Sequence, residues 1–223
     1  MVKPRTIKFL ASKSSGQVSA LFLRPPDARW LMVLGHGAGA GMRHPFMESI
    51  SKHLVDAGIA TFRYQFPYME HKSWRPDPQP VLLATVRSAV EAATKADSSL
   101  PLLAGGKSMG GRMTSLAASA DELAGVRGIA FFGFPLHPPG KQGTERAKHL
   151  EHVKVPMLFL QGTRDKLADL TLLRPVCSAL PQATLSIIEG GDHSFNVLKS
   201  SGKTSTDILN ELVSSVIEWT GTL

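Results

Sequence analysis

The sequence predicts an α/β protein: a mostly parallel, twisted sheet with helices on both faces. Short apolar runs rich in β-forming residues alternate along the chain with segments of helical periodicity. Each apolar run ends at a glycine or another turn residue, and no repeat or low-complexity segment interrupts the alternation. Such alternation is typical of βαβ units with right-handed crossovers. Because the chain has 223 residues, we expect one domain covering residues 1–223.

Seven apolar runs predict strands, and the continuous run 30–34 (WLMVL) is typical of a strand buried on both faces. The predicted strands are residues 18–23, 30–34, 59–64, 100–104, 126–132, 156–160 and 184–188. The predicted helices are residues 45–57, 81–96, 108–120, 168–180 and 205–220. Only residues 133–155 separate the fifth and sixth of these strands, so we expect no large cap domain there.

Composition excludes several other classes of protein. A hydrophobic content of 43% is enough for a packed core, and the single cysteine, Cys177, forms no intrachain disulfide and is expected in the core. The net charge of +7 favours acidic partners, but the basic residues are scattered, so we expect no nucleic-acid partner. The amino-terminal segment lacks an apolar signal region and no stretch is long enough to cross a bilayer. We therefore expect a cytoplasmic protein without a membrane partner, and the oligomeric state is left open.

A Gly-x-Ser-x-Gly pattern follows the predicted strand 100–104. It reads Gly106-Lys107-Ser108-Met109-Gly110 and opens a predicted helix. A sharp strand-to-helix turn would lift the Ser108 hydroxyl out of the sheet, and small neighbours would let the backbone pass closely. The pattern predicts that Ser108 is a nucleophile; the alternative is a glycine-rich turn that only packs.

An acid and a histidine follow two later strands. Asp165 comes after the strand 156–160, and His193 follows the strand 184–188 in a glycine-rich turn. Taken singly, Asp165 could be a helix N-cap, and His193 could be structural. Together the order Ser108, Asp165, His193 is that of nucleophile, acid and base in an α/β-hydrolase triad. Because parallel sheets carry their sites at the carboxyl ends of strands, we expect the three side chains to meet.

The glycine-rich loop 35–41 (GHGAGAG) is the candidate for the other half of an oxyanion hole. Two amide donors are needed. We expect one from Met109 and the other from Ala38 or Gly37, with Ala38 preferred. A dinucleotide-binding loop is the alternative, but Met42 stands where that fingerprint needs its third glycine.

Six segments together resemble the small α/β-hydrolases related to the testis-expressed protein 30 family and, more distantly, dienelactone hydrolases. They are residues 35–39 (GHGAG), 62–68 (FRYQFPY), 106–112 (GKSMGGR), 133–141 (GFPLHPPGK), 161–165 (QGTRD) and 191–195 (GDHSF). The resemblance spans about residue 17 to the carboxyl terminus. It implies the α/β-hydrolase fold and Ser108, Asp165 and His193 as the triad. Dienelactone hydrolases use a cysteine nucleophile, so Ser108 argues against that particular activity.

These residues predict a serine hydrolase that cleaves a small carboxylic ester or thioester through an acyl-enzyme, with no cofactor and no metal. The alternatives are a peptidase or amidase on the same triad, or a non-catalytic interaction module on a hydrolase scaffold. Residues near the predicted pocket give weak substrate clues. We expect Lys107, Phe134 and Tyr68 to contact the substrate, although a solvated lysine and ordinary aromatic packing would explain them equally well.

Overall fold

A computed structural model describes residues 3–223, and within them eight strands form one sheet in the order β1-β2-β4-β3-β5-β6-β7-β8. The strands are β1 (Arg5–Ser12), β2 (Gly16–Leu23), β3 (Trp30–Gly35), β4 (Ile59–Tyr64), β5 (Leu102–Lys107), β6 (Val126–Phe132), β7 (Met157–Gly162) and β8 (Ala183–Ile188). From β4 to β8 every neighbouring pair is parallel, whereas β2 pairs antiparallel with both β1 and β4. The predicted α/β architecture with a mostly parallel sheet is confirmed.

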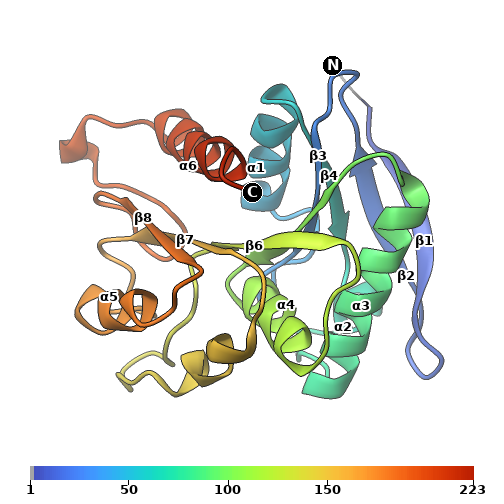
Figure 1. Ribbon diagram of the computed structural model, residues 1–223, viewed down its shortest axis with the longest axis horizontal. Coiled ribbons are helices and arrows are strands. Elements are labelled where there is room, and N and C mark those ends of the chain that lie inside the picture. Colours follow the sequence, from blue (N-terminus) through green and yellow to red (C-terminus); the bar gives the residue numbers. More distant parts are fainter. Residues whose placement is uncertain (1–2) are drawn as a thin grey trace.

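Helices cover both faces of the sheet. They are α1 (Pro45–Asp56), α2 (Pro67–Glu70), α3 (Gln79–Ala96), α4 (Met109–Ala120), α5 (Leu170–Ser178) and α6 (Ser205–Thr220), with short 3₁₀ turns η1 (Glu145–His152) and η2 (Lys199–Ser201). Helices α1 and α6 lie side by side on one face, and α3, α4 and α5 lie on the other (Figure 1). Between β6 and β7 the chain forms only η1 and loops, so no large cap domain covers the sheet.

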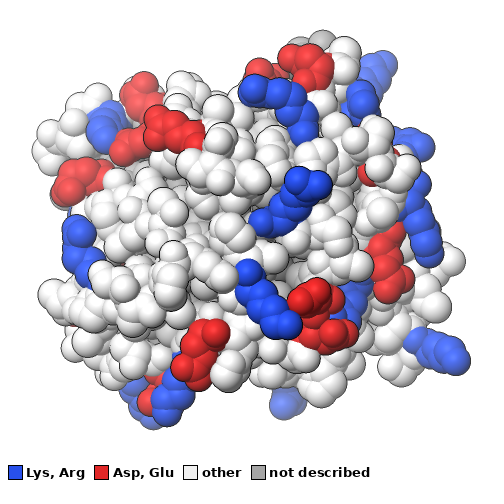
Figure 2. Space-filling view, in the orientation of Figure 1, with Lys and Arg blue, Asp and Glu red and all other residues white. Residues whose placement is uncertain are grey.

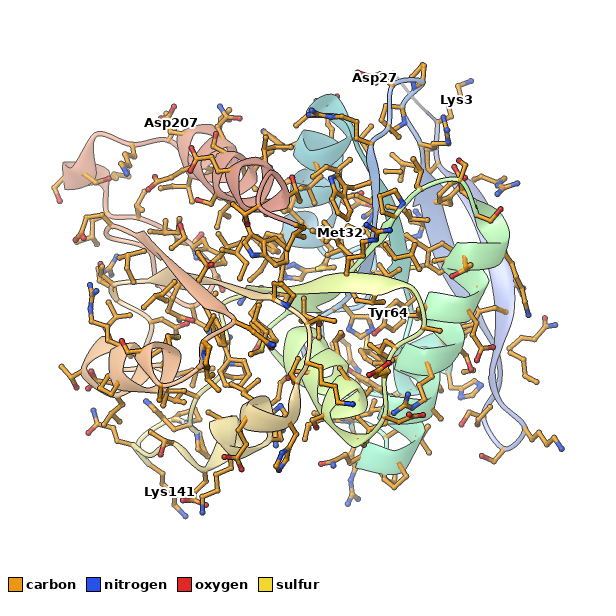
Figure 3. All side chains as sticks on the ribbon, in the orientation of Figure 1. Lys3, Asp27, Met32, Tyr64, Lys141 and Asp207 are labelled. Atoms are coloured by element: carbon orange, nitrogen blue, oxygen red, sulfur yellow. The ribbon has the colours of Figure 1, made fainter. Side chains whose placement is uncertain are left out.

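Two apolar cores result from this arrangement, because successive strand residues point to opposite faces. In β3, Val33 packs into the core beneath α3, α4 and α5, whereas Met32 packs into the core beneath α1 and α6. Tyr64 lies in the first core and Met32 in the second, and both are labelled in Figure 3. Burial on both faces explains why the inner strands β3 to β7 are mostly apolar runs.

The sequence analysis missed β1. This edge strand alternates: Phe9 and Ala11 are buried, whereas Leu10 is 53% exposed. Such an antiparallel edge strand lacks the continuous apolar run by which the inner strands were recognised. The predicted strand at 100–104 is present as β5, which begins two residues later and ends three residues later. The predicted strand at 156–160 is present as β7, which begins one residue later and ends two residues later.

Charged side chains are scattered on the surface. On the face drawn in Figure 2, lysines and arginines are interspersed with acidic residues rather than gathered in one patch. No helix within residues 3–223 is both long enough and apolar enough to cross a membrane.

Candidate active site

Ser108 lies on a sharp turn between β5 and α4. Its backbone has φ 49° and ψ −113°, a conformation that residues other than glycine rarely adopt, and it is the N-cap of α4. Gly106 and Gly110 pass so close to the Gly35 backbone that a Cβ at either position would overlap the Gly35 carbonyl oxygen. The two glycines therefore let the strained turn pack against the end of β3.

The structure brings together the three side chains that the sequence analysis selected. His193 Nε2 lies 2.8 Å from Ser108 Oγ, and His193 Nδ1 lies 2.7 Å from Asp165 Oδ2. Ser108 follows β5, Asp165 follows β7 and His193 follows β8, so all three stand at carboxyl ends of strands. The His193 side chain is 24% exposed, whereas that of Asp165 is fully buried. A buried carboxylate thus faces one ring nitrogen and a hydroxyl faces the other.

Asp165 is held in place by further hydrogen bonds. Gln161 Nε2 donates to its Oδ2, and the Leu167 backbone N–H donates to its Oδ1 at 2.8 Å. With a carboxylate accepting at Nδ1, the neutral His193 ring carries its proton on Nδ1 and leaves Nε2 free to accept from Ser108. Helix α5 has its own N-cap in Asp169, which accepts from Thr171. Asp165 therefore does not cap that helix.

Buried side chains fix the glycine-rich loop after β3. His36 Nε2 accepts from the Phe66 N–H at 3.1 Å, and its Nδ1 donates to the Gly37 carbonyl at 2.8 Å. Burial lowers the pKa of His36 to about 4, so this ring stays neutral. The Tyr68 hydroxyl accepts from the Gly39 N–H at 3.1 Å.

The far end of the loop is fixed from β4. Gln65 Oε1 accepts from the Met42 N–H at 2.7 Å, and Arg63 donates to the Met42 carbonyl at 3.0 Å. The sequence analysis assigned no role to His36 or Gln65 beyond their place in the motifs. Polar residues are unusual at the end of a buried strand. The polar residues of the 62–68 segment were therefore a signal that this segment supports a neighbouring loop.

The loop and the helix start present unused amides near Ser108. In the part of the chain that is described, neither the Ala38 nor the Met109 N–H donates to another protein group. A Cβ at Gly37 would stand 3.8 Å from Ser108 Cβ, so the loop lies against the serine. An oxyanion hole requires two such unpaired donors, and these two lie in the segments that flank Ser108.

A second Ser–His contact lies further along α4. Ser115 Oγ is 2.8 Å from His149 Nε2 of η1, and Ser115 also donates to the Arg112 carbonyl. Burial, and then the neighbouring Arg112 charge, lower the pKa of His149 to about 4. The sequence analysis did not select this pair.

Comparison with known proteins decides the family. Residues 28–221 match the family model described as the alpha/beta hydrolase domain. The chain belongs to this alpha/beta hydrolase family. The match covers most of the chain and includes every residue of the site described above, and the enzyme is accordingly a hydrolase.

Solved structures share this fold. A dienelactone hydrolase from Anabaena variabilis has a TM-score of 0.74 at 19% identity, covering 98% of this chain and 96% of that chain. A serine hydrolase without a lid from Xanthomonas campestris has a TM-score of 0.74 at 19% identity, with 97% and 95% covered. A cold-adapted esterase from an Arctic intertidal metagenomic library has a TM-score of 0.66 at 18% identity, with 96% and 92% covered.

The three residues that the sequence analysis expected to contact the substrate are buried in the structure of this hydrolase. Phe134 is fully buried and packs on Phe131 and Phe159 in the core. Tyr68 is buried beneath the glycine-rich loop, and the Lys107 ammonium points to the His193 backbone rather than to solvent. The pattern gave their position along the chain, but the side-chain direction was set by tertiary packing.

No three histidine, cysteine, aspartate or glutamate side chains of the hydrolase are grouped as metal ligands within residues 3–223. The thiol of Cys177 is buried in α5, and this burial raises its pKa to about 12. Cys177 therefore stays protonated at neutral pH and has no thiolate to offer as a nucleophile or ligand.

Proposed function

We propose that this hydrolase cleaves small carboxylic esters or thioesters with Ser108, His193 and Asp165 as its catalytic triad. The observation that carries the proposal is the unbroken chain of hydrogen bonds from Ser108 Oγ through His193 to Asp165, at 2.8 and 2.7 Å. It begins at a strained residue on a strand-to-helix turn, which is the setting of an activated nucleophile.

In the first half of the reaction, Ser108 Oγ attacks the acyl carbon and His193 Nε2 takes the hydroxyl proton. Asp165 holds the ring in the required tautomer and stabilises the imidazolium that forms. The N–H groups of Met109 and Ala38 donate to the developing oxyanion. The imidazolium then protonates the departing alcohol or thiol, which leaves an ester of Ser108.

In the second half, His193 takes a proton from water, and the hydroxide attacks the acyl carbon. The tetrahedral intermediate collapses, the proton returns to Ser108 and the carboxylic acid departs. Each deprotonation is balanced by a protonation of the leaving oxygen or sulfur, so no cofactor or metal is required.

An ester rather than an amide is favoured by the similar structures, one of which is named an esterase. A peptidase or amidase would use the same residues, and a non-catalytic module would not need an assembled triad. The relation to the testis-expressed protein 30 family, the single-domain organisation and the cytoplasmic location stay predictions.

Labelling with a fluorophosphonate probe tests the proposal. We expect one adduct on Ser108, located by peptide mass spectrometry and absent in Ser108→Ala and His193→Ala. His149→Ala is the matched control, because it removes the other histidine that touches a serine of this helix region. A folded protein that takes no label, or takes it on Ser115, would contradict the proposed triad.

Substrate preference is then read from p-nitrophenyl esters of graded acyl length, the matching thioesters and p-nitroanilides. We expect turnover of short esters and thioesters to exceed that of anilides. Faster turnover of the anilides would replace the esterase with an amidase while leaving the triad in place.

A further inference from the structure

Lys107, the residue before Ser108, has its ammonium buried inside the protein. The residue is only 9% exposed, and its Nζ donates to the backbone carbonyl of His193 at 2.5 Å. Because Lys107 and Ser108 are consecutive, this bond ties the backbone beside the nucleophile to the backbone of the residue that contacts it. A ring of contacts is therefore closed through the Ser108–His193 hydrogen bond.

Aromatic rings surround the ammonium on the α1 side. Its Nζ lies 5.9 Å from the ring centre of Phe46 in α1 and 5.5 Å from that of Phe195, and the two rings stack on each other. Cation–π attraction to two rings offsets part of the loss of hydration. Phe195 itself has a positive φ of 62°, rare for a bulky residue, so the segment after His193 is held in an unusual conformation.

The charged groups that face Lys107 are carboxylates from two loops. Burial lowers the pKa of Lys107 to about 8, against the opposing attraction of Asp165 and Asp192. Gly133, after β6, leaves the space: a Cβ there would stand 3.0 Å from Lys107 Nζ and 3.6 Å from Asp165 Oδ2. At neutral pH the amine is thus mostly charged and flanks the same carboxylate as the His193 ring.

An ammonium that was buried only to fill space would destabilise the folded protein. Transfer of a charge out of water is strongly unfavourable, and apolar residues of similar volume are often as stable in such positions. A methionine would pack against Phe46 and Phe195 without that cost. What only the lysine provides here is a donor to the His193 carbonyl and a positive charge beside the triad.

We propose that Lys107 is a positioning residue, whose ammonium holds His193 against Ser108 and places a positive charge beside the triad. This inference rests on the proposed triad. A cation beside the triad opposes formation of the imidazolium. The fixed geometry outweighs this cost, since a displacement of about 1 Å can cost 10²-fold in rate.

The test compares Lys107→Met with wild type. The rate constant for fluorophosphonate labelling is measured from pH 5 to 9, with the thermal midpoint of each protein. We expect the maximal rate to fall about 10- to 100-fold. We also expect the acid-side decline in rate to move to higher pH, because a positive charge beside the triad is removed. The midpoint should stay within a few degrees, because the lost hydrogen bond is offset by the removed burial of charge.

Lys166→Met is the matched control. Lys166 is exposed and follows Asp165 directly in the chain, so its substitution removes an equal charge without removing a contact of the triad. We expect its rate and pH profile to match wild type. A Lys107→Met protein with the wild-type rate and acid-side decline, or a Lys166→Met protein with the same changes, would overturn the inference.

A histidine-ring NMR titration separates this inference from the proposed function. The His193 signal is assigned with His193→Gln, and no substrate is needed. We expect the ring to be protonated at higher pH in Lys107→Met than in wild type. If the His193 titration shifts but the wild-type protein takes no fluorophosphonate label, the proposed esterase is refuted and the electrostatic effect of Lys107 is supported. If the titration is unchanged and labelling is normal, only the role of Lys107 is refuted.

Discussion

Two Ser–His contacts of equal length lie about two helical turns apart, and they differ in nearly everything else. Ser108 Oγ to His193 Nε2 and Ser115 Oγ to His149 Nε2 are both 2.8 Å. Ser108 stands on the strained turn before α4, whereas Ser115 lies inside that helix and is fully buried. The Ser115 hydroxyl also donates to a backbone carbonyl of its own helix, so its proton is already engaged.

The histidines differ in their third partner. His193 has the buried carboxylate of Asp165 at its second nitrogen. His149 has no ion-pair partner within residues 3–223, and the neighbouring Arg112 and His152 both disfavour its protonated form. Burial and these neighbours lower its pKa to about 4, so it is a poor base at neutral pH. The comparison teaches that a Ser–His distance alone does not make a nucleophile.

The largest expected effect comes from removing the carboxylate that distinguishes the first pair. In Asp165→Asn an amide replaces the acceptor at His193 Nδ1, and the ring is free to take the unproductive tautomer. We expect hydrolysis of p-nitrophenyl acetate and fluorophosphonate labelling to slow by about 10⁴-fold. Steady-state kinetics and labelling rates check this, with circular dichroism to show that the variant is folded.

Asp192→Asn is the matched control for that change. Asp192 is the neighbour of His193, but its carboxylate accepts from the Ser194 and Asn196 backbone within its own turn. We expect a much smaller loss of rate, from a less firmly held turn. If Asp192→Asn were the more damaging substitution, Asp192 would replace Asp165 as the acid of the triad.

An intermediate effect is expected when a contact that supports the glycine-rich loop is removed. Within residues 3–223, the Ser115 pair has no such loop beside it. Tyr68→Phe removes the hydroxyl that accepts from the Gly39 N–H. Because a lost oxyanion donor costs 10²–10³ in rate, we expect loosening of the loop to lower kcat by about tenfold with little change in KM. Kinetics with one short ester measure the split between the two constants.

Tyr64→Phe serves as its control. The Tyr64 hydroxyl is buried and has no hydrogen-bond partner among residues 3–223, and the nearby Thr114 hydroxyl donates to the Gly105 and Gly110 carbonyls instead. Removing an unpaired buried hydroxyl should leave kcat unchanged and stability equal or slightly higher. An equal loss of kcat in both variants would show that any change beneath the loop slows the enzyme.

The sequence predicted the inner strands because each is buried on both faces and therefore reads as an apolar run. It predicted Ser108, Asp165 and His193 because parallel strands bring their carboxyl ends to one edge of the sheet. The sequence did not predict the directions in which the neighbouring side chains point. Lys107 and Phe134 stand at strand ends, where pocket residues are expected, yet both side chains point inward. The Lys107 ammonium packs against Phe46 and Phe195, and Phe134 packs against Phe159 in the core.

The smallest effect on activity is expected at His149, where the comparison predicts a role in stability alone. The folded-state pKa of about 4 lies below the ordinary value of 6.5, so between these values the unfolded chain binds a proton that the folded protein does not. The contribution of His149 to stability is thus complete above pH 6.5 and declines as the pH falls toward 4. His149→Gln does not titrate there.

Urea unfolding of wild type and His149→Gln at pH 7, 5.5 and 4.5 measures this decline. We expect the stability advantage of wild type to shrink as the pH falls, while the labelling rate of the variant at pH 7 equals that of wild type. Titrations elsewhere affect both proteins alike and cancel in the difference. A stability difference that does not change with pH would place the His149 ring in a less buried or less cationic setting, and a slower labelling rate would join the two Ser–His contacts into one functional unit.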